Sequence, residues 1–181
     1  YMEIKPKIVI GLGNPGEEYE KTYHNVGFLF IKYLINKKPT NSELIKSDVY
    51  MNESGKFVAK IMQKTGVKPE ELLVVHDDSD IELGKYKLSF GRGSAGHKGA
   101  ESIIKSLGTK NFWRLRIGIR KVSSIKYQVL RKKAEEFVLR KISKADLEIL
   151  NQVFWKINST KERYKKENVA SPRNYISSTP N

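Results

Sequence analysis

The sequence predicts a single α/β domain, in which helices flank a mixed, mostly parallel and twisted sheet. Two observations predict this fold. Short apolar runs that suit strands alternate along the chain with segments whose apolar residues recur at helical spacing. The chain has 181 residues, 39% of them hydrophobic, which is enough for one buried core, and it shows neither an internal repeat nor a linker. We therefore expect residues 1–181 to form one domain, with a polar tail from about residue 168.

The first half of the chain predicts two strands and two helices. Residues 7–12 form a short apolar strand that ends at a Gly-Asn-Pro-Gly turn signal. Residues 23–36 and 55–65 carry apolar side chains near helical spacing, and Gly66 is placed to end the second helix. Residues 71–76 contain four consecutive apolar residues, which predicts a strand buried on both faces.

The second half predicts two further strands and a helix. Residues 85–90 and 114–117 alternate apolar side chains with basic or polar ones, which is typical of half-exposed strands that carry cations on one face. A helix is expected from about residue 144 to residue 156, where apolar side chains return at helical spacing. The alternation of strands and helices favours a layered α/β architecture.

Positive charge is concentrated in residues 83–134. This segment holds fourteen Lys and Arg residues and only one acidic residue, Glu101, so it carries a net charge of +13 in a chain whose formal net charge is +14. A field localised in this way is typical of proteins that bind a polyanion, most simply the phosphate backbone of a nucleic acid. A general coat of surface lysines would also give a positive net charge, so charge alone leaves both interpretations open.

The absence of cysteine excludes thiol catalysis, disulfides and zinc sites built on thiolates, and it is typical of a reducing compartment. The first residues lack the pattern of a signal peptide, and no apolar run is long enough to span a bilayer. We therefore expect a soluble, cytoplasmic protein with no membrane partner.

Residues 11–16 match the dinucleotide-binding pattern G-x-G-x-x-G. That pattern needs a helix that begins inside it and an acidic residue about twenty positions later. Residues 33–40 contain no Asp or Glu, and the Asn14-Pro15 pair predicts a turn that delays the helix. A nucleotide cofactor is therefore not expected.

Polar residues cluster at the predicted ends of strands and starts of helices. Asn14 follows the first strand, at the edge where open α/β sheets place ligands, and Asn52 precedes a helix. Asp77 and Asp78 follow the most apolar strand, and residues 91–99 form a Gly-rich loop that can approach phosphate. Each feature taken alone also fits an ordinary turn or helix cap.

In their order along the chain, these features resemble the bacterial peptidyl-tRNA hydrolase family. The motifs lie at residues 11–16, 22–27, 50–55, 76–84, 96–99 and 112–118, with a weaker similarity at 136–139. The resemblance implies a monomeric α/β enzyme that needs neither metal nor cofactor. Such an enzyme hydrolyses the ester between a peptide, or another N-substituted aminoacyl group, and the 3′ end of tRNA. It thereby recycles tRNA from prematurely released peptidyl-tRNA.

The same resemblance implies a role for each matching residue. His24 would be the general base that activates water, and Asp77 would fix its tautomer and stabilise the imidazolium. Substrate binding is implied for Asn14, Tyr19, Met51, Asn52 and Lys98, and tRNA binding for Lys87 and Arg116. The amides of Asn14 and Asn52 would donate hydrogen bonds to substrate carbonyls.

Four departures from the family pattern concern the substrate cleft more than the reaction. Lys98 stands where the family usually has Asn, which would either turn that point toward phosphate or weaken the positioning of the substrate. Tyr23 stands where Arg is common, and Arg120-Lys121 replaces the usual Gly-Arg-Pro turn. The stretch between His24 and Tyr50 is also shorter than usual.

Two alternative functions remain. One is an RNA-binding relative that kept the fold and lost hydrolysis, although the retained His24 and Asp77 argue against it. The other is a zinc hydrolase that uses His24, His76 and His97, although no HExxH-type spacing supports it.

Overall fold

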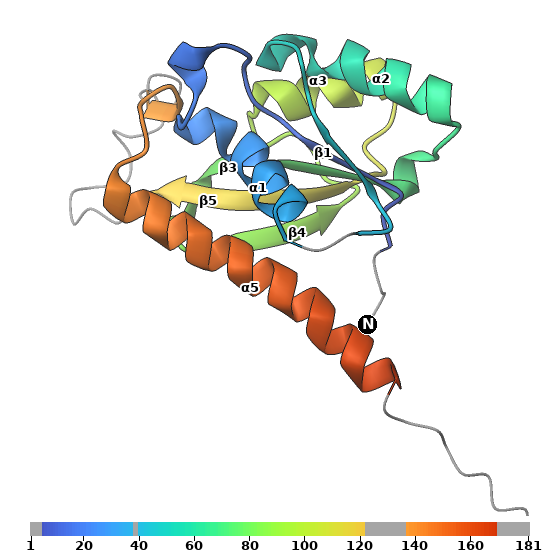
Figure 1. Cartoon of the computed structure of the whole chain (residues 1–181). Helices are drawn as coiled ribbons and strands as arrows, with labels where there is room; N and C mark the ends of the chain where they lie inside the picture. Colours follow the sequence, from blue (N-terminus) through green and yellow to red (C-terminus); the bar gives the residue numbers. More distant parts are fainter. Residues whose placement is uncertain (1–4, 38–39, 122–136, 170–181) are drawn as a thin grey trace, which may run out of the picture.

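A five-stranded sheet forms the centre of the computed structural model, which describes residues 5–37, 40–121 and 137–169 (Figure 1). The strands are β1 (Ile8–Gly11), β2 (Glu43–Lys46), β3 (Leu72–Glu82), β4 (Tyr86–Phe90) and β5 (Trp113–Arg120). Their order across the sheet is β2-β1-β3-β5-β4. The first four strands in this order are parallel, and β4 at the edge runs antiparallel to β5. The predicted mixed, mostly parallel sheet is confirmed.

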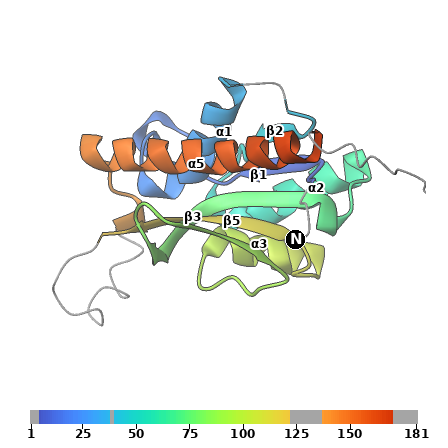
Figure 2. The same cartoon turned by 90° about the horizontal axis from the view of Figure 1, so that it is seen from below.

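Helices cover both faces of the sheet. They are α1 (Val26–Ile35), α2 (Ser54–Thr65), α3 (Lys98–Leu107) and α5 (Lys144–Val169), with single 3-10 turns η1 (Glu17–Tyr19), η2 (Tyr23–Asn25), η3 (Met51–Glu53) and η4 (Pro69–Glu71). Figure 2 shows α1 and α5 on one side of the sheet and α3 on the other. None of these helices combines the length and apolar character that crossing a membrane would require.

Two apolar cores, one on each side of the sheet, explain why the central strands are continuously hydrophobic. Leu73 and Val75 of β3 pack toward α1 and α5, whereas Leu72 and Val74 pack with residues of α2 and α3. Because successive side chains of a strand point to opposite faces, both faces need apolar residues. Burial of each such side chain contributes about 1.5–3 kcal/mol, so these strands form a rigid base for the residues that follow them.

Close backbone contact seats the start of α1 on the sheet. A Cβ atom on Gly27 would lie 2.4 Å from the carbonyl oxygen of Val75, and one on Gly11 would lie 2.4 Å from the carbonyl oxygen of Gly27. Only glycine allows backbones to approach this closely. The η2 turn that immediately precedes α1 is thereby held near the carboxyl end of β1 and beside the middle of β3.

The structure corrects several predicted boundaries. The helix expected at residues 23–36 begins at Val26, because residues 23–25 form the separate η2 turn. The strand expected at residues 71–76 continues to Glu82, since its second half pairs with β5 although it is polar. The last helix runs to Val169, so it includes the start of the expected polar tail. The rest of that tail lies outside the described residues, as do four residues of the basic segment, Lys126, Arg131, Lys132 and Lys133.

Two elements, β2 and α3, were not predicted. The short β2 has only four residues and no strong apolar alternation. The α3 helix begins inside the glycine-rich segment, directly after His97, whose ring nitrogen caps it by accepting from the N–H of Ala100. This capping depends on the ring position and is not visible in the sequence.

The expected cationic face of the last two strands is wrong for Arg114, which is only 1% exposed. Ser89, its partner across β4 and β5, is buried too, whereas Leu88 is 42% exposed. The expected alternation is therefore absent from β4, where Ser89 alone is buried. Arg114 is covered by the loop before α3, whose carbonyls accept from its guanidinium.

A buried polar contact joins η2 to α5. The Tyr23 hydroxyl donates to Asp146 in the first turn of α5, and Lys121 Nζ lies 2.6 Å from the same carboxylate oxygen. The Tyr23 ring also stacks on Phe137, with 4.6 Å between the ring centroids. The Tyr23 N–H donates to the carbonyl of Arg140, which adds a backbone link. The C-terminal segment therefore braces the turn that carries residue 24.

We expect Asp146→Ala to lower the free energy of unfolding by about 2 kcal/mol at pH 7, because it leaves the buried Tyr23 hydroxyl without its acceptor. Bonds to Lys121 and Tyr23 outweigh the opposing effect of burial and lower the pKa of Asp146. The stabilisation should therefore be complete above about pH 4 and disappear as the pH falls through the folded-state value. Urea unfolding at several pH values measures this. Equal loss for exposed Glu148→Ala in the same helix would contradict it.

Candidate active site

A buried carboxylate lies at the centre of a group of imidazoles in the middle of β3. Asp77, 2% exposed, follows the apolar half of the strand. The η2 turn brings His24 to it, and the N-terminus of α3 brings His97. Three segments far apart in the sequence thus meet just beyond the carboxyl end of β1, whose last residue, Gly11, pairs with Val75. Open α/β sheets bind ligands beyond the carboxyl ends of their strands.

Both imidazoles bind the same carboxylate oxygen. His24 Nδ1 lies 2.8 Å from Asp77 Oδ1, and His97 Nε2 lies 3.1 Å from it. A carboxylate can only accept, so each of these nitrogens carries a proton. His97 Nδ1 accepts from the N–H of Ala100 at 3.1 Å, which fixes His97 as the neutral tautomer protonated on Nε2. When His24 is neutral, its lone pair is therefore on Nε2.

The electrostatics of the cluster favour a basic imidazole at His24. Burial lowers the pKa of His24, but the charge of Asp77 and its hydrogen bond outweigh burial and raise the pKa above the usual value. The charge of Lys98 acts in the opposite direction. Burial would raise the pKa of Asp77, yet His24 and His97 hold it far below its usual range. Asp77 therefore stays ionised wherever His24 titrates.

His76 plays a different part. It is completely buried; its Nδ1 donates to the Asp77 carbonyl at 2.6 Å, and its Nε2 lies 3.5 Å from Arg114 Nη1. Burial and the neighbouring His97 hold the pKa of His76 well below its usual value, so the ring is neutral. Both ring nitrogens face protein groups, which removes His76 from the zinc site considered above.

A metal ion could instead be sought among His24, Asp77 and His97, whose ligand atoms lie within 4.8 Å of one another. Coordination through His97 Nε2 would move the ring proton to Nδ1, where it would face the N–H of Ala100. This would remove the cap of α3. The donor set therefore fits two hydrogen bonds to a carboxylate better than a metal ion.

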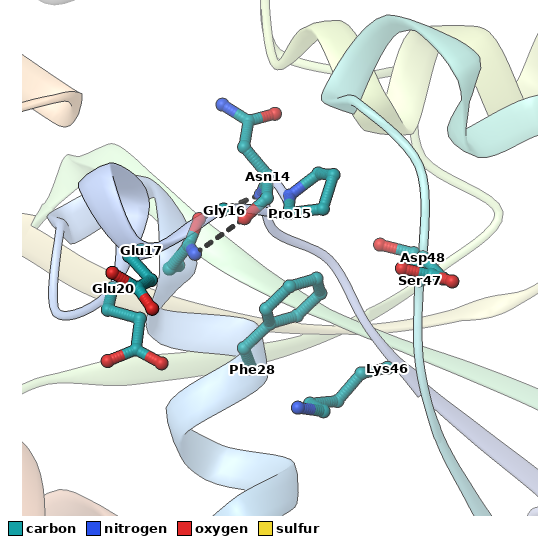
Figure 3. A pocket seen from close by; sticks show the side chains of 10 residues that line it. Asn14, Pro15, Gly16, Glu17, Glu20, Phe28, Lys46, Ser47 and Asp48 are labelled. Atoms are coloured by element: carbon teal, nitrogen blue, oxygen red, sulfur yellow. Dashed lines mark hydrogen bonds between the residues drawn. The ribbon is translucent and has the colours of Figure 1, made fainter.

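Three hydrogen bonds hold Asn14 in place. Its backbone N–H donates to Asn25 Oδ1 at 2.8 Å, and Asn25 Nδ2 donates to its carbonyl at 2.9 Å. Its side-chain oxygen accepts from the Met51 N–H at 2.9 Å, which leaves the amino group as the side-chain donor. Figure 3 shows this side chain pointing away from Phe28 and the pocket that the Asn14 segment lines.

That pocket is open and carries acidic groups. Its lining residues are Asn14, Pro15, Gly16, Glu17, Glu20, Asn25, Phe28, Lys46, Ser47 and Asp48 (Figure 3). None of the three residues that meet at Asp77 Oδ1 lines it. The pocket is therefore separate from the imidazole cluster.

The other predicted substrate-binding residues occupy different settings. Met51 is buried, and its sulfur lies so close to Gly99 that a Cβ there would approach within 2.5 Å. Tyr19 packs edge-on against Tyr50. Asn52 is exposed, and its carbonyl accepts from Ser102 Oγ at 2.7 Å. Met51 thus supports Asn14 through its backbone, whereas Asn52 presents its side chain to solvent.

The three predicted cations also differ. Lys98 is exposed at the start of α3, and Lys87 is exposed on β4. Arg116 lies opposite Lys87 on β5, but its Nε donates to Asp78 Oδ2 at 2.6 Å and its side chain is only 14% exposed. Lys98 and Lys87 are thus the more accessible of the three.

Sequence reasoning missed the structural roles of three residues. Asn25, which clamps Asn14, follows His24 directly within a recognised motif, but its contact crosses eleven positions of chain. His97 was considered only as a metal ligand, and Arg114 only as an exposed cation. Gly99 was the one sequence signal of close packing beside His97, since a Cβ there would lie 2.5 Å from the Met51 sulfur.

Comparisons with known proteins find similar sequences and a similar fold. A family model described as peptidyl-tRNA hydrolase matches residues 8–180. The peptidyl-tRNA hydrolase of Aquifex aeolicus is 38% identical over 169 residues, which cover 83% of this chain and 85% of that protein. The Lawsonia intracellularis enzyme is 44% identical over 138 residues, covering 65% and 68%. A crystal structure of peptidyl-tRNA hydrolase from Acinetobacter baumannii superposes with a TM-score of 0.75 at 27% identity, over 93% of each chain.

An NMR titration should give His24 a pKa above about 6.5, the value of an unperturbed histidine. Asp77→Asn should move the pKa of His24 below that value, because the amide removes the stabilising charge while burial remains. Asp80→Asn, at an exposed position of the same strand, serves as the control and should leave the titration unchanged. A His24 pKa that does not respond to Asp77→Asn would contradict the pairing.

Proposed function

Because the chain belongs to the peptidyl-tRNA hydrolase family, we propose that it hydrolyses the ester between a peptide and the 3′ end of tRNA, with His24 as general base. Such a reaction recycles tRNA from prematurely released peptidyl-tRNA. The observation that carries the proposal is the hydrogen bond of 2.8 Å between His24 Nδ1 and Asp77 Oδ1, which leaves the lone pair on Nε2.

The proposed reaction needs no covalent intermediate. His24 Nε2 takes a proton from water while the water oxygen attacks the ester carbonyl carbon. Asp77 stabilises the imidazolium that forms. The tetrahedral intermediate then collapses, the bond to the ribose oxygen breaks, and that oxygen receives the proton from His24. The products are tRNA with a free hydroxyl and a peptide with a free carboxyl group, which releases its proton to solvent and becomes a carboxylate.

Neutral hydrogen-bond donors suit the charge that develops on the ester oxygen. Asn14 offers its amino group, and the contacts with Asn25 and Met51 hold it in place before the substrate arrives. Such preorganised donors stabilise an oxyanion without reorganising during the reaction. Asn52 supplies a second amide from an exposed turn, where it can meet the peptide part of the substrate.

The tRNA would bind across β4 and the start of α3. Lys87 and Lys98 are both exposed there, and the N-terminus of α3 adds a partial positive charge. Because Arg116 is paired with Asp78, it would contribute to tRNA binding through its electrostatic field more than through direct contact with a phosphate. Phosphate contacts of this kind position the nucleic acid, while the chemistry occurs at Asp77 and His24.

The proposal extends to the working state of the protein. All residues of the imidazole cluster belong to one chain and lie within one sheet-centred unit, which supports a monomer that acts as a single domain. A peptidyl-tRNA substrate is a product of translation, which supports action in the cytoplasm.

The first test is peptide release from N-acetyl-aminoacyl-tRNA in EDTA. His24→Ala should reduce kcat by about 10²-fold to 10⁴-fold, because it removes the base, while the affinity for tRNA stays nearly unchanged. Wild-type turnover should not respond to EDTA. Binding of tRNA without any release by the wild type would overturn the hydrolase proposal and favour an RNA-binding function.

The second test is the salt dependence of tRNA binding. Affinity should fall steeply as salt rises, and Lys87→Glu should make this slope shallower by about 1 for each lost phosphate contact. The matched control is Lys32→Glu, the same charge change at an exposed position of α1 on the other side of the sheet. Equal effects of the two substitutions would refute a localised tRNA surface.

A further inference from the structure

Arg114 is a fully buried cation that mainly binds carbonyl groups of a loop. Its Nη2 donates to the carbonyl of Gly93 at 2.5 Å and to that of Arg92 at 3.2 Å. Its Nη1 lies 3.5 Å from the carbonyl of Ser94. A planar guanidinium can bridge several acceptors in this way, whereas a lysine ammonium cannot reproduce the fork. Arg114 therefore holds three successive peptide groups in one arrangement.

The loop held by Arg114 has an unusual backbone. Gly91 and Gly96 have φ angles of 63° and 82°, and Ala95, which has a side chain, has a φ of 54°. A residue with a side chain rarely adopts such a conformation, which persists only when its surroundings enforce it. The loop leads directly into His97, so its shape determines the position of the His97 backbone and thus of its imidazole.

A second route connects Arg114 to the same imidazole. His76 Nε2 lies 3.5 Å from Arg114 Nη1, and the His76 ring packs against His97 with 4.2 Å between the centroids. The other nitrogen of His76 donates to the Asp77 carbonyl. Arg114 thus constrains His97 in two ways. One is through the His76 ring, which packs against His97, and the other is through the loop that precedes His97.

We propose that Arg114 is a positioning residue that presents His97 to Asp77, and that His97 thereby shares with His24 the negative charge of one carboxylate oxygen. The inference deepens the proposed function, since it concerns the strength of the same base. None of the hydrogen bonds described for Arg114 reaches His24. Arg114 acts through the Asp77–His97 hydrogen bond, which is 3.1 Å long.

The direction of the effect follows from competition at Asp77 Oδ1. A donated N–H from His97 withdraws part of the negative charge that would otherwise stabilise the imidazolium of His24. When Arg114 no longer fixes the loop, this bond weakens and more of the charge acts on His24. The pKa of His24 then rises, so more of the base is protonated at neutral pH. Arg114 in this way keeps the base available to accept a proton.

The test is a double-substitution cycle read by NMR titration of the His24 imidazole. Arg114→Lys keeps the charge and removes the fork, and we expect it to raise the His24 pKa by about 0.5 to 1. His97→Ala should raise it similarly, and the double variant should show no further rise, because both substitutions act on one bond. Additive shifts, or no shift in Arg114→Lys, would overturn the proposal.

The control and the reserve variant use neighbouring positions. Ser89, across the strand from Arg114, has a buried hydroxyl without a partner among the described residues, so Ser89→Ala should leave the titration unchanged. If Arg114→Lys does not fold, Arg114→Gln removes the buried charge and should give the same upward shift. The titration needs no substrate, so a protein that fails to hydrolyse peptidyl-tRNA would leave this result interpretable.

Discussion

One carboxylate oxygen organises this protein. Asp77 Oδ1 accepts from two imidazoles that arrive from opposite faces of the sheet, and each bond fixes a tautomer. The ionised state of Asp77 is in turn maintained by those same rings despite complete burial. A buried charge is tolerated only with such partners, so the three residues depend on one another. Because these three residues lie far apart in the sequence, only the folded chain brings them together.

The surrounding architecture serves this meeting point. The apolar half of β3 gives Asp77 a rigid base, and Gly27 lets the turn before α1 come close enough for His24 to reach it. On the other face, the cap of α3 orients His97 before any substrate is present. Packing, backbone contact and helix capping thus each determine one of the three positions, which explains why residues without chemical roles are needed for the geometry.

Prediction from the sequence succeeded where a local pattern carries the information. Hydrophobic runs predicted β1 and the apolar half of β3, and Gly66 marked the end of α2 with its left-handed conformation. Prediction failed where a tertiary contact determines the burial or the role of a residue. Arg114 alternates with apolar residues as an exposed cation would, and only the loop carbonyls above it explain its burial. The role of His97 depends on which of its ring nitrogens accepts from the N–H of Ala100, and composition and spacing do not specify this.

The link between Tyr23 and Asp146 has a consequence for how the protein is made. Tyr23 is synthesised 123 positions before Asp146. The turn beside His24 therefore lacks this contact until α5 has emerged from the ribosome. The growing chain is itself a peptide attached to tRNA, the kind of ester that this enzyme cleaves. Because α5 is synthesised after the turn that carries His24, that turn lacks its contact with α5 for part of the time that the chain is attached to tRNA.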